Sequence, residues 1–182
     1  MSARLPVENS DTVSLVCALL VRYPEIASMR SASGENSVRF SFAVSQRIDK
    51  SAQRALAADI EEHVDGFLAL GGDEGSVLVE CESDRAMSFV HVSRDLETFS
   101  NGELAMLVGL FCERFGAALV RNPVPDEQPD EDPVLQDELA ESAIEALRDP
   151  AQSRSLVGFR EEKRVLVYFL KAQKKAKASA RR

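Results

Sequence analysis

Polar residues that could do chemistry gather around His91 in a stretch of alternating sequence. Along residues 87–94, His91 faces away from Val90 and Val92, and residues 38–45 and 75–82 alternate in the same way. Neighbouring strands with a period of two place their alternate positions on one face of a sheet. We therefore predict a candidate ligand face that consists of His91, Arg39, Ser41, Glu80, Glu82 and Phe89.

This set of side chains has two interpretations. A histidine, an arginine and two carboxylates on one face can bind a ligand or serve as an acid–base cluster. The same groups can equally be cross-strand partners beneath a C-terminal hairpin or another subunit. We favour the second interpretation, because structural ion-pair networks also bring titratable groups together.

The other reactive side chains form no catalytic or metal-binding motif. His63 follows Asp59 by four residues, which places the two on one helix face as an exposed pair without further metal ligands. No GxSxG sequence is present, and the cysteines Cys17, Cys81 and Cys112 lie far apart among apolar neighbours. We predict no catalytic residue, no metal and no cofactor.

Two segments resemble ligand-binding loops only in part. Residues 71–75 are rich in glycine, but they lack the GK[ST] ending of a phosphate-binding loop and contain two acids. Residues 126–132 have the carboxylates of a calcium loop, but Pro129 interrupts them and the central glycine is missing. We interpret the first segment as the end of a helix and the second as part of a solvated linker.

The segments that position the candidate face predict an α+β protein. A buried helix is expected from residue 10 or 11 to residue 21, and residues 38–45 form a half-buried strand. A long helix begins at Asp49 and ends at Gly71–Gly72, because a glycine pair supplies a helix stop. Residues 75–82 and 87–94 then form a hairpin.

The next helix carries a start signal of its own. Ser100 and Glu103 have the spacing of a capping box, and the helix that follows ends near Gly116. Residues 117–120 are expected to form a short strand. The resulting order, a helix followed by β-α-β-β-α-β, predicts a ferredoxin-like core with an antiparallel sheet and two helices on one face.

Changes of composition divide the chain into four parts. We expect an α+β core domain at residues 1–121, an acidic proline-rich linker at 122–133, a helix and β-hairpin extension at 134–170, and a basic flexible tail at 171–182.

The extension contains an amphipathic helix and a final hairpin. Residues 134–148 repeat apolar positions at helical spacing, and residues 155–160 and 164–170 form two strands. An alternative reads residues 163–178 as one helix, but the β-branched and aromatic run from Val165 argues against it. Residues 165–170 are apolar on both faces, so we expect this hairpin to be covered.

Charge and hydropathy exclude several classes of protein. The net charge of the 182 residues is −8, and the six basic residues at 171–182 leave −14 on the first 170. Such an acidic body repels phosphate backbones, although the basic tail can make a weak contact with nucleic acid. The apolar run at residues 13–21 is too short to span a membrane and has no signal-peptide flanks, so we expect a cytoplasmic protein.

These observations favour a non-catalytic interaction or regulatory protein that forms a homodimer. The two-sided apolar hairpin and the open sheet face both suggest self-association or a protein partner. The alternative is a small-ligand sensor or an enzyme of unrecognised type that uses the face around His91.

Overall fold

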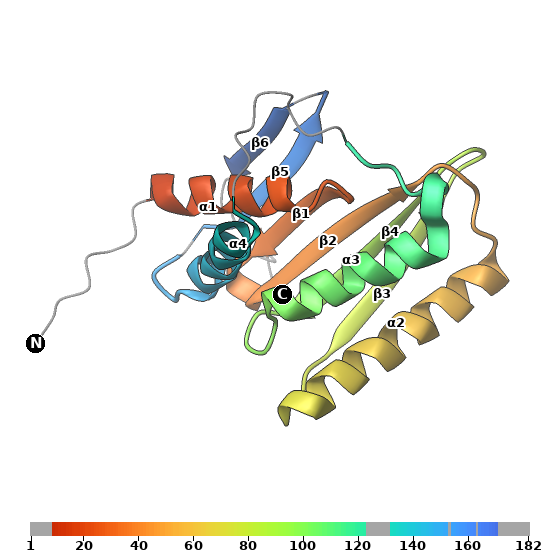
Figure 1. Ribbon diagram of the computed structural model, residues 1–182, viewed down its shortest axis with the longest axis horizontal. Coiled ribbons are helices and arrows are strands. Elements are labelled where there is room, and N and C mark those ends of the chain that lie inside the picture. The colour runs from red at the N-terminus through yellow and green to blue at the C-terminus, as the bar shows by residue number, and fades with distance from the viewer. Residues whose placement is uncertain (1–8, 123–131, 153, 163, 171–182) are drawn as a thin grey trace, which may run out of the picture.

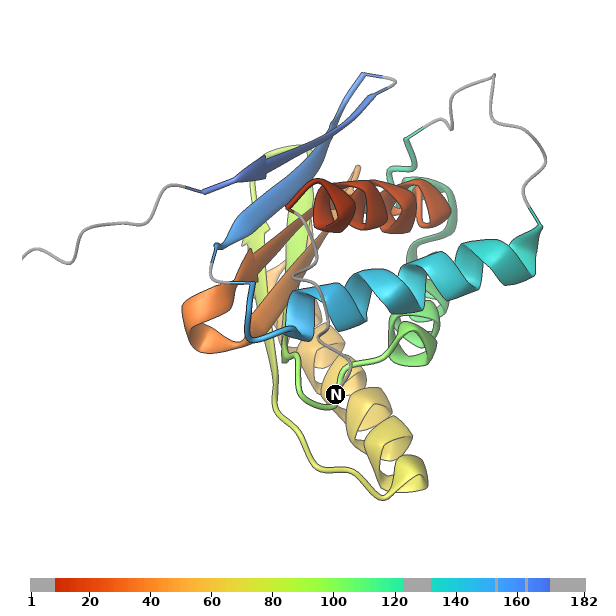
Figure 2. The same cartoon turned by 90° about the vertical axis from the view of Figure 1, so that its left-hand side faces the viewer.

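The chain folds around one antiparallel sheet that is covered by helices on a single face. A computed structural model describes residues 9–122, 132–152, 154–162 and 164–170. The sheet has six strands in the order β3-β4-β2-β1-β5-β6, so that three hairpins lie side by side. Helices α1 to α4 pack on one side of this sheet and leave its other side uncovered by described elements (Figures 1 and 2).

The first hairpin includes a strand that the sequence pattern did not predict. Helix α1 spans Asn9–Arg22, close to the expected limits, and β1 (Ile26–Ala32) pairs with β2 (Ser37–Val44). The register shifts between Ile26 and Ser28, so the buried residues of β1 do not keep a strict period of two. The strand itself is confirmed, with Phe40 and Phe42 fully buried toward the helices, but it is not half-buried, because Ser41 and Ala43 on its other side are also buried.

Helix α2 (Lys50–Gly71) begins and ends at the predicted residues. The Asp49 carboxylate accepts hydrogen bonds from the backbone N–H groups of Ser51 and Ala52. Gly72 adopts a left-handed conformation with φ of 75°, which a glycine tolerates without strain. The predicted hairpin follows as β3 (Val77–Ser83) and β4 (Ser88–Asp95).

The start of helix α3 (Asn101–Phe115) combines half of the predicted capping box with an unexpected ion pair. Ser100 accepts a hydrogen bond from the backbone N–H of Glu103, as expected. The Glu103 carboxylate instead accepts hydrogen bonds from Arg94. The predicted strand at residues 117–120 is wrong, because Gly116–Ala118 form a 3₁₀ turn and only Leu119 makes a bridge to Val44.

The C-terminal segments add a helix and two strands to the same layers. Helix α4 (Pro133–Arg148) packs beside α1, and the hairpin of β5 (Leu156–Glu161) and β6 (Arg164–Phe169) joins the sheet through β1. The alternative helix over residues 163–178 is therefore wrong where the chain is described. Residues 123–131 of the predicted linker and the predicted tail at 171–182 lie outside the described residues.

The α+β class is confirmed, but the ferredoxin-like arrangement is not. The additional strand β1 lies between β2 and β5, and every strand pair in the sheet is antiparallel. The observed order is therefore three adjacent hairpins and not a split β-α-β unit.

One glycine allows α1 to lie close to the sheet. A Cβ atom on Gly158 of β5 would lie 2.7 Å from Leu20 Cδ1 in α1. Leu20 and Met29, which also contacts this position, are fully buried in a core that runs without interruption from α1 to β5. The absence of a side chain at Gly158 thus sets how closely the extension packs on the first hairpin.

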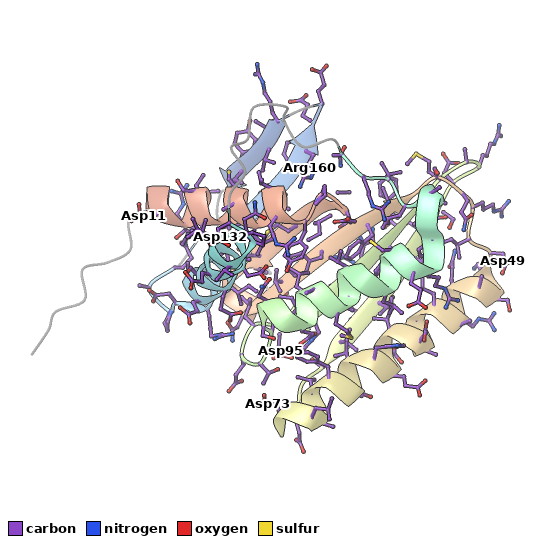
Figure 3. The ribbon with its side chains drawn as sticks, viewed as in Figure 1. Asp11, Asp49, Asp73, Asp95, Asp132 and Arg160 are labelled. Atoms are coloured by element: carbon purple, nitrogen blue, oxygen red, sulfur yellow. The ribbon has the colours of Figure 1, made fainter. Side chains whose placement is uncertain are left out.

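Arg160 ties the extension to the N-terminal part through the backbone. Its guanidinium donates to the carbonyl oxygens of Tyr23 and Ile26, each at 3.2 Å, across the turn between α1 and β1 (Figure 3). None of the described helices has the length and apolar character needed to cross a membrane.

Candidate functional site

The uncovered side of the sheet, which we call the open face, brings most of the predicted ligand residues into register. Cross-strand pairing places Glu80, His91 and Ser41 in one row, and Arg39 and Ser93 in the next. The strand pattern alone was sufficient to predict this assembly, because alternate residues of paired strands share a face.

His91 makes its closest polar contact with Ser41. The Nδ1 atom of His91 lies 2.8 Å from the hydroxyl oxygen of Ser41, its direct cross-strand neighbour. Burial lowers the pKa of His91 below its ordinary value, and the charge of Arg39 lowers it further, while Glu82 opposes both. The imidazole is therefore neutral near pH 7.

A serine and a histidine at hydrogen-bond distance have the geometry of a nucleophile and its base. Here, however, the Ser41 side chain is on a strand in the middle of the sheet and only 7% of the residue is exposed. No described residue forms a hydrogen bond that would orient the second ring nitrogen of His91. The pair can hold a ligand group or fix the two strands, but it is poorly arranged for attack on a substrate.

Arg39 on β2 forms an ion pair with Glu80 on β3, and the pair spans the intervening strand β4. One terminal nitrogen of the guanidinium donates to the Glu80 carboxylate, and the two side chains are 38% and 50% exposed. The Nε atom of Arg39 is buried and has no hydrogen-bond partner among the described residues. Arg39 therefore retains an unused donor.

Arg30 is a residue of this face that the sequence analysis missed. It lies on β1, directly opposite Arg39, and is exposed. Two like charges at opposite positions of a strand pair are unfavourable unless a counter-charge lies near them. An alternation of apolar and polar residues along β1 would have predicted the position of Arg30. The shift in register within β1 interrupts that alternation.

A shallow hollow of about 620 Å³ lies over the row that contains these arginines. Arg30, Arg39 and Glu80 contribute to its lining, together with Glu35 and Ser93. His91, Ser41, Glu82 and Phe89 do not line the hollow. The predicted ligand residues are thus divided, with only Arg39 and Glu80 at the concave part of the face.

The opposite end of the open face is apolar. Val157 and Phe159 of β5 lie opposite Tyr168 and Leu166 of β6, and the rings of Phe159 and Tyr168 are 6.0 Å apart. We call these four residues the apolar flank. Tyr168 is 53% exposed, so the predicted covering of the hairpin is found only on its other side, where α1 packs.

A second cluster of charges lies on the helix-covered side of the sheet. Arg94 and Glu103 form a fully buried ion pair at 2.6 Å, and Arg94 also donates to Asp95, Thr98 and the carbonyl oxygen of Ser76. Burial raises the pKa of Glu103, and the hydrogen bond from Arg94 opposes this effect. The ion pair joins β4 to the start of α3. Because Arg94 and Glu103 both have hydrogen-bond partners inside the protein, we interpret the cluster as structural.

His63 and the three cysteines take no part in the open-face contacts described above. His63 contacts Asp59 on α2, with Nδ1 2.7 Å from the backbone oxygen and 3.4 Å from the carboxylate. Cys17, Cys81 and Cys112 are free thiols, and burial raises the pKa of Cys17 and of Cys81.

The described part of the chain contains no group of three or more histidine, cysteine, aspartate or glutamate residues that could hold a metal ion. In comparisons with known proteins, no family model, no curated protein and no solved structure matches this chain.

Proposed function

We propose that the protein is a non-catalytic interaction protein, that it works as a homodimer, and that it holds a partner on the open face. The observation that carries this proposal is the set of apolar side chains that the fold leaves in contact with water. Leu78, Phe89 and Tyr168 on this face are 57%, 40% and 53% exposed. Contiguous apolar groups at the surface are typical of protein-binding surfaces, and the apolar flank, whose four residues face one another on β5 and β6, is such a group.

The distribution of charge on the open face supports recognition of a specific partner. Glu80 and Glu82 lie on β3 at one side, Arg30 and Arg39 lie in the centre, and the apolar flank lies at the other side. A partner that contacts the whole face must match an acidic, a basic and an apolar region in that order. Such complementarity gives specificity in addition to affinity.

The proposal is tested by photo-crosslinking in cells at single positions. A photoreactive phenylalanine analogue replaces Phe89 or Tyr168 on the open face, and Leu70 serves as the control. Leu70 is 91% exposed but lies on α2, on the helical side of the sheet. We expect adducts from the two open-face positions and none from Leu70. Equal labelling at Leu70, or no adduct at either open-face position, would overturn the proposal.

Self-association is tested on the purified chain by light scattering over the micromolar range. The proposal predicts a mass twice that of the 20.0 kDa chain. A strict monomer at high micromolar concentration removes the homodimer from the proposal.

A second candidate function is the binding of a small ligand, and the hollow near Arg39 favours it. The guanidinium groups of Arg30 and Arg39, which both contribute to the lining, suit an anionic group such as a carboxylate. A thermal-shift screen with metabolites and nucleotides tests this candidate, with Arg39→Gln as the matched variant. A ligand that stabilises the wild type and not the variant supports it, and a screen without any stabilising ligand contradicts it.

A further inference from the structure

Arg30 is an exposed cation that the described part of the chain does not neutralise. It lies on β1 directly opposite Arg39, and Arg39 already has Glu80 as its counter-ion. No ion pair or side-chain hydrogen bond joins Arg30 to another described residue. Like charges at opposite positions of a strand pair are destabilising. Arg30 therefore lowers the stability of the sheet, and no described residue compensates for this effect.

The hollow around Arg30 contains other charges, but most of them are paired. Its lining includes two ion pairs, which are Arg39 with Glu80 and Arg94 with Asp95. The lining also includes Glu35, which lies in the turn after β1, beyond the end of the strand that carries Arg30. Among the described residues of this lining, Arg30 is the cation that is left for a carboxylate from outside the chain.

Apolar side chains begin on the strand next to Arg30. Val157 of β5 lies directly opposite Arg30, and Tyr168 of β6 lies opposite Val157, so the three residues form one row across the sheet. Neighbouring strands are about 4.8 Å apart, so the apolar flank begins about 5 Å from Arg30 and extends to about 10 Å. A cation beside an exposed apolar surface suits a ligand that carries a carboxylate close to an apolar group.

An extended peptide meets this requirement better than a small molecule does. Side chains two positions apart in an extended chain point to the same side and lie about 7 Å from each other. An acidic residue that contacts Arg30 then places the second side chain over the apolar flank. Sites for small molecules usually surround most of the ligand, whereas this hollow is shallow and Tyr168 is 53% exposed.

We propose that the open face binds an extended segment of a partner protein in which an acidic residue lies two positions from a large apolar residue. The carboxylate pairs with Arg30, and the apolar side chain packs on the apolar flank. This inference rests on the partner binding in the proposed function and names the chemistry of the partner. It does not depend on the homodimer.

The first test selects binders for the purified full-length chain from a random library of seven-residue peptides displayed on phage. We expect the enriched peptides to carry aspartate or glutamate two positions from phenylalanine, tyrosine, tryptophan or leucine. The same selection on Arg30→Gln should not enrich acidic peptides. Enrichment of peptides without an acidic residue, or no enrichment at all, contradicts the proposal.

The second test is a double-mutant cycle between Arg30 and the acidic residue of an enriched peptide, with binding followed by fluorescence anisotropy. Arg30→Gln should raise the dissociation constant by about tenfold, and so should glutamine in place of the acidic residue of the peptide. Both changes together should weaken binding no more than either alone, because they remove one interaction. Fully additive losses would show that the carboxylate does not contact Arg30.

Two further variants act as controls of charge. Arg54→Gln removes an exposed arginine on α2, on the helical side of the sheet, and should leave the affinity unchanged. Glu35→Gln removes a negative charge from the hollow and should leave the affinity unchanged or increase it. A loss of affinity in Glu35→Gln as large as that in Arg30→Gln would mean that the ligand is recognised through a cation, and would exclude the proposed carboxylate.

Thermal unfolding separates binding from a structural role of Arg30. Arg30→Gln should not lower the melting temperature, because it removes a like charge opposite Arg39. A lower melting temperature with unchanged peptide affinity would make Arg30 a structural residue and refute the proposal. Binding of N-acetylphenylalanine as tight as that of the peptide would replace the peptide with a small acid.

These outcomes are distinct from failure of the proposed function. Photo-adducts from Phe89 and Tyr168, together with failure of the peptide tests, leave a protein-binding open face whose partner has a different chemistry. No adduct from either position overturns both proposals.

Discussion

The two faces of the sheet are built from the same strands but have different physical roles. Phe42 is fully buried and stacks on Phe111 of α3 at 3.9 Å, whereas Phe89 is 40% exposed one strand away. The Arg94–Glu103 pair has no exposure at all, whereas the Arg39–Glu80 pair lies at the surface. The side chains on the helix-covered face therefore make up the core, whereas those on the open face remain in contact with water.

The largest difference between the faces is expected from truncation of a phenylalanine. Phe42→Ala leaves a cavity in the core and should cost about 3–5 kcal/mol of unfolding free energy. Phe89→Ala should cost about 0.5 kcal/mol or less, because its ring already contacts water. Urea denaturation measures both. Similar losses would mean that the open face is covered in solution.

The two ion pairs give the next largest contrast. Glu103→Ala leaves Arg94 charged and buried without its main partner, which should cost about 3–5 kcal/mol. Glu80→Ala removes a partner from an exposed pair and should cost about 1 kcal/mol or less. A small effect at Glu103 would contradict the structural role of the buried cluster.

A smaller effect is expected where α1 meets the sheet. Gly158→Ala introduces a Cβ atom 2.7 Å from Leu20 Cδ1, and overpacking of this kind costs about 1–3 kcal/mol. Gly66→Ala on α2 is the control, because a Cβ atom there meets nothing within 4 Å. Thermal unfolding compares the two, and a stabilised Gly158→Ala chain would show that α1 is not held so closely.

The smallest expected effect is a dependence of stability on pH from His91. Its pKa in the folded chain lies below the ordinary value of 6.5, so the unfolded chain binds more protons between these two values. The stabilisation of the folded chain by neutral His91 is fully present above the pKa of His91 in the unfolded chain. It is lost as the pH falls through the lower pKa of His91 in the folded chain. Urea midpoints measured from pH 7 downward should fall less steeply in His91→Gln. If the urea midpoint depends on pH equally in both chains, the pKa of His91 does not change on folding, and its imidazole is solvent-exposed.

Local signals in the sequence determined much of the fold because they act over a few residues. Asp49 and Gly72 bound α2 through contacts with their own neighbours, and the alternation of residues 38–44 assigns both faces of β2. The open-face neighbours Ser41, Glu80 and His91 were predicted from the same alternation.

Features that depend on distant parts of the chain were not predictable in this way. Strand β1 was missed because its register shift breaks the pattern, and Arg30 was missed with it. Residues 117–120 are apolar, as in a buried strand, but the turn that begins at Gly116 leaves only one bridge to β2.

The sequence by itself determined helices α1 to α4, strands β2 to β6 and the caps at Asp49, Gly72 and Ser100, since these follow from backbone geometry and spacing. The tertiary structure alone decided that helices α1 to α4 lie on one side, that Glu103 bonds to Arg94 and not to its own helix start, and that β6 ends the sheet (Figure 2). The physical reason is that these outcomes depend on which buried surfaces and charges meet across the chain, and spacing within a segment does not specify that.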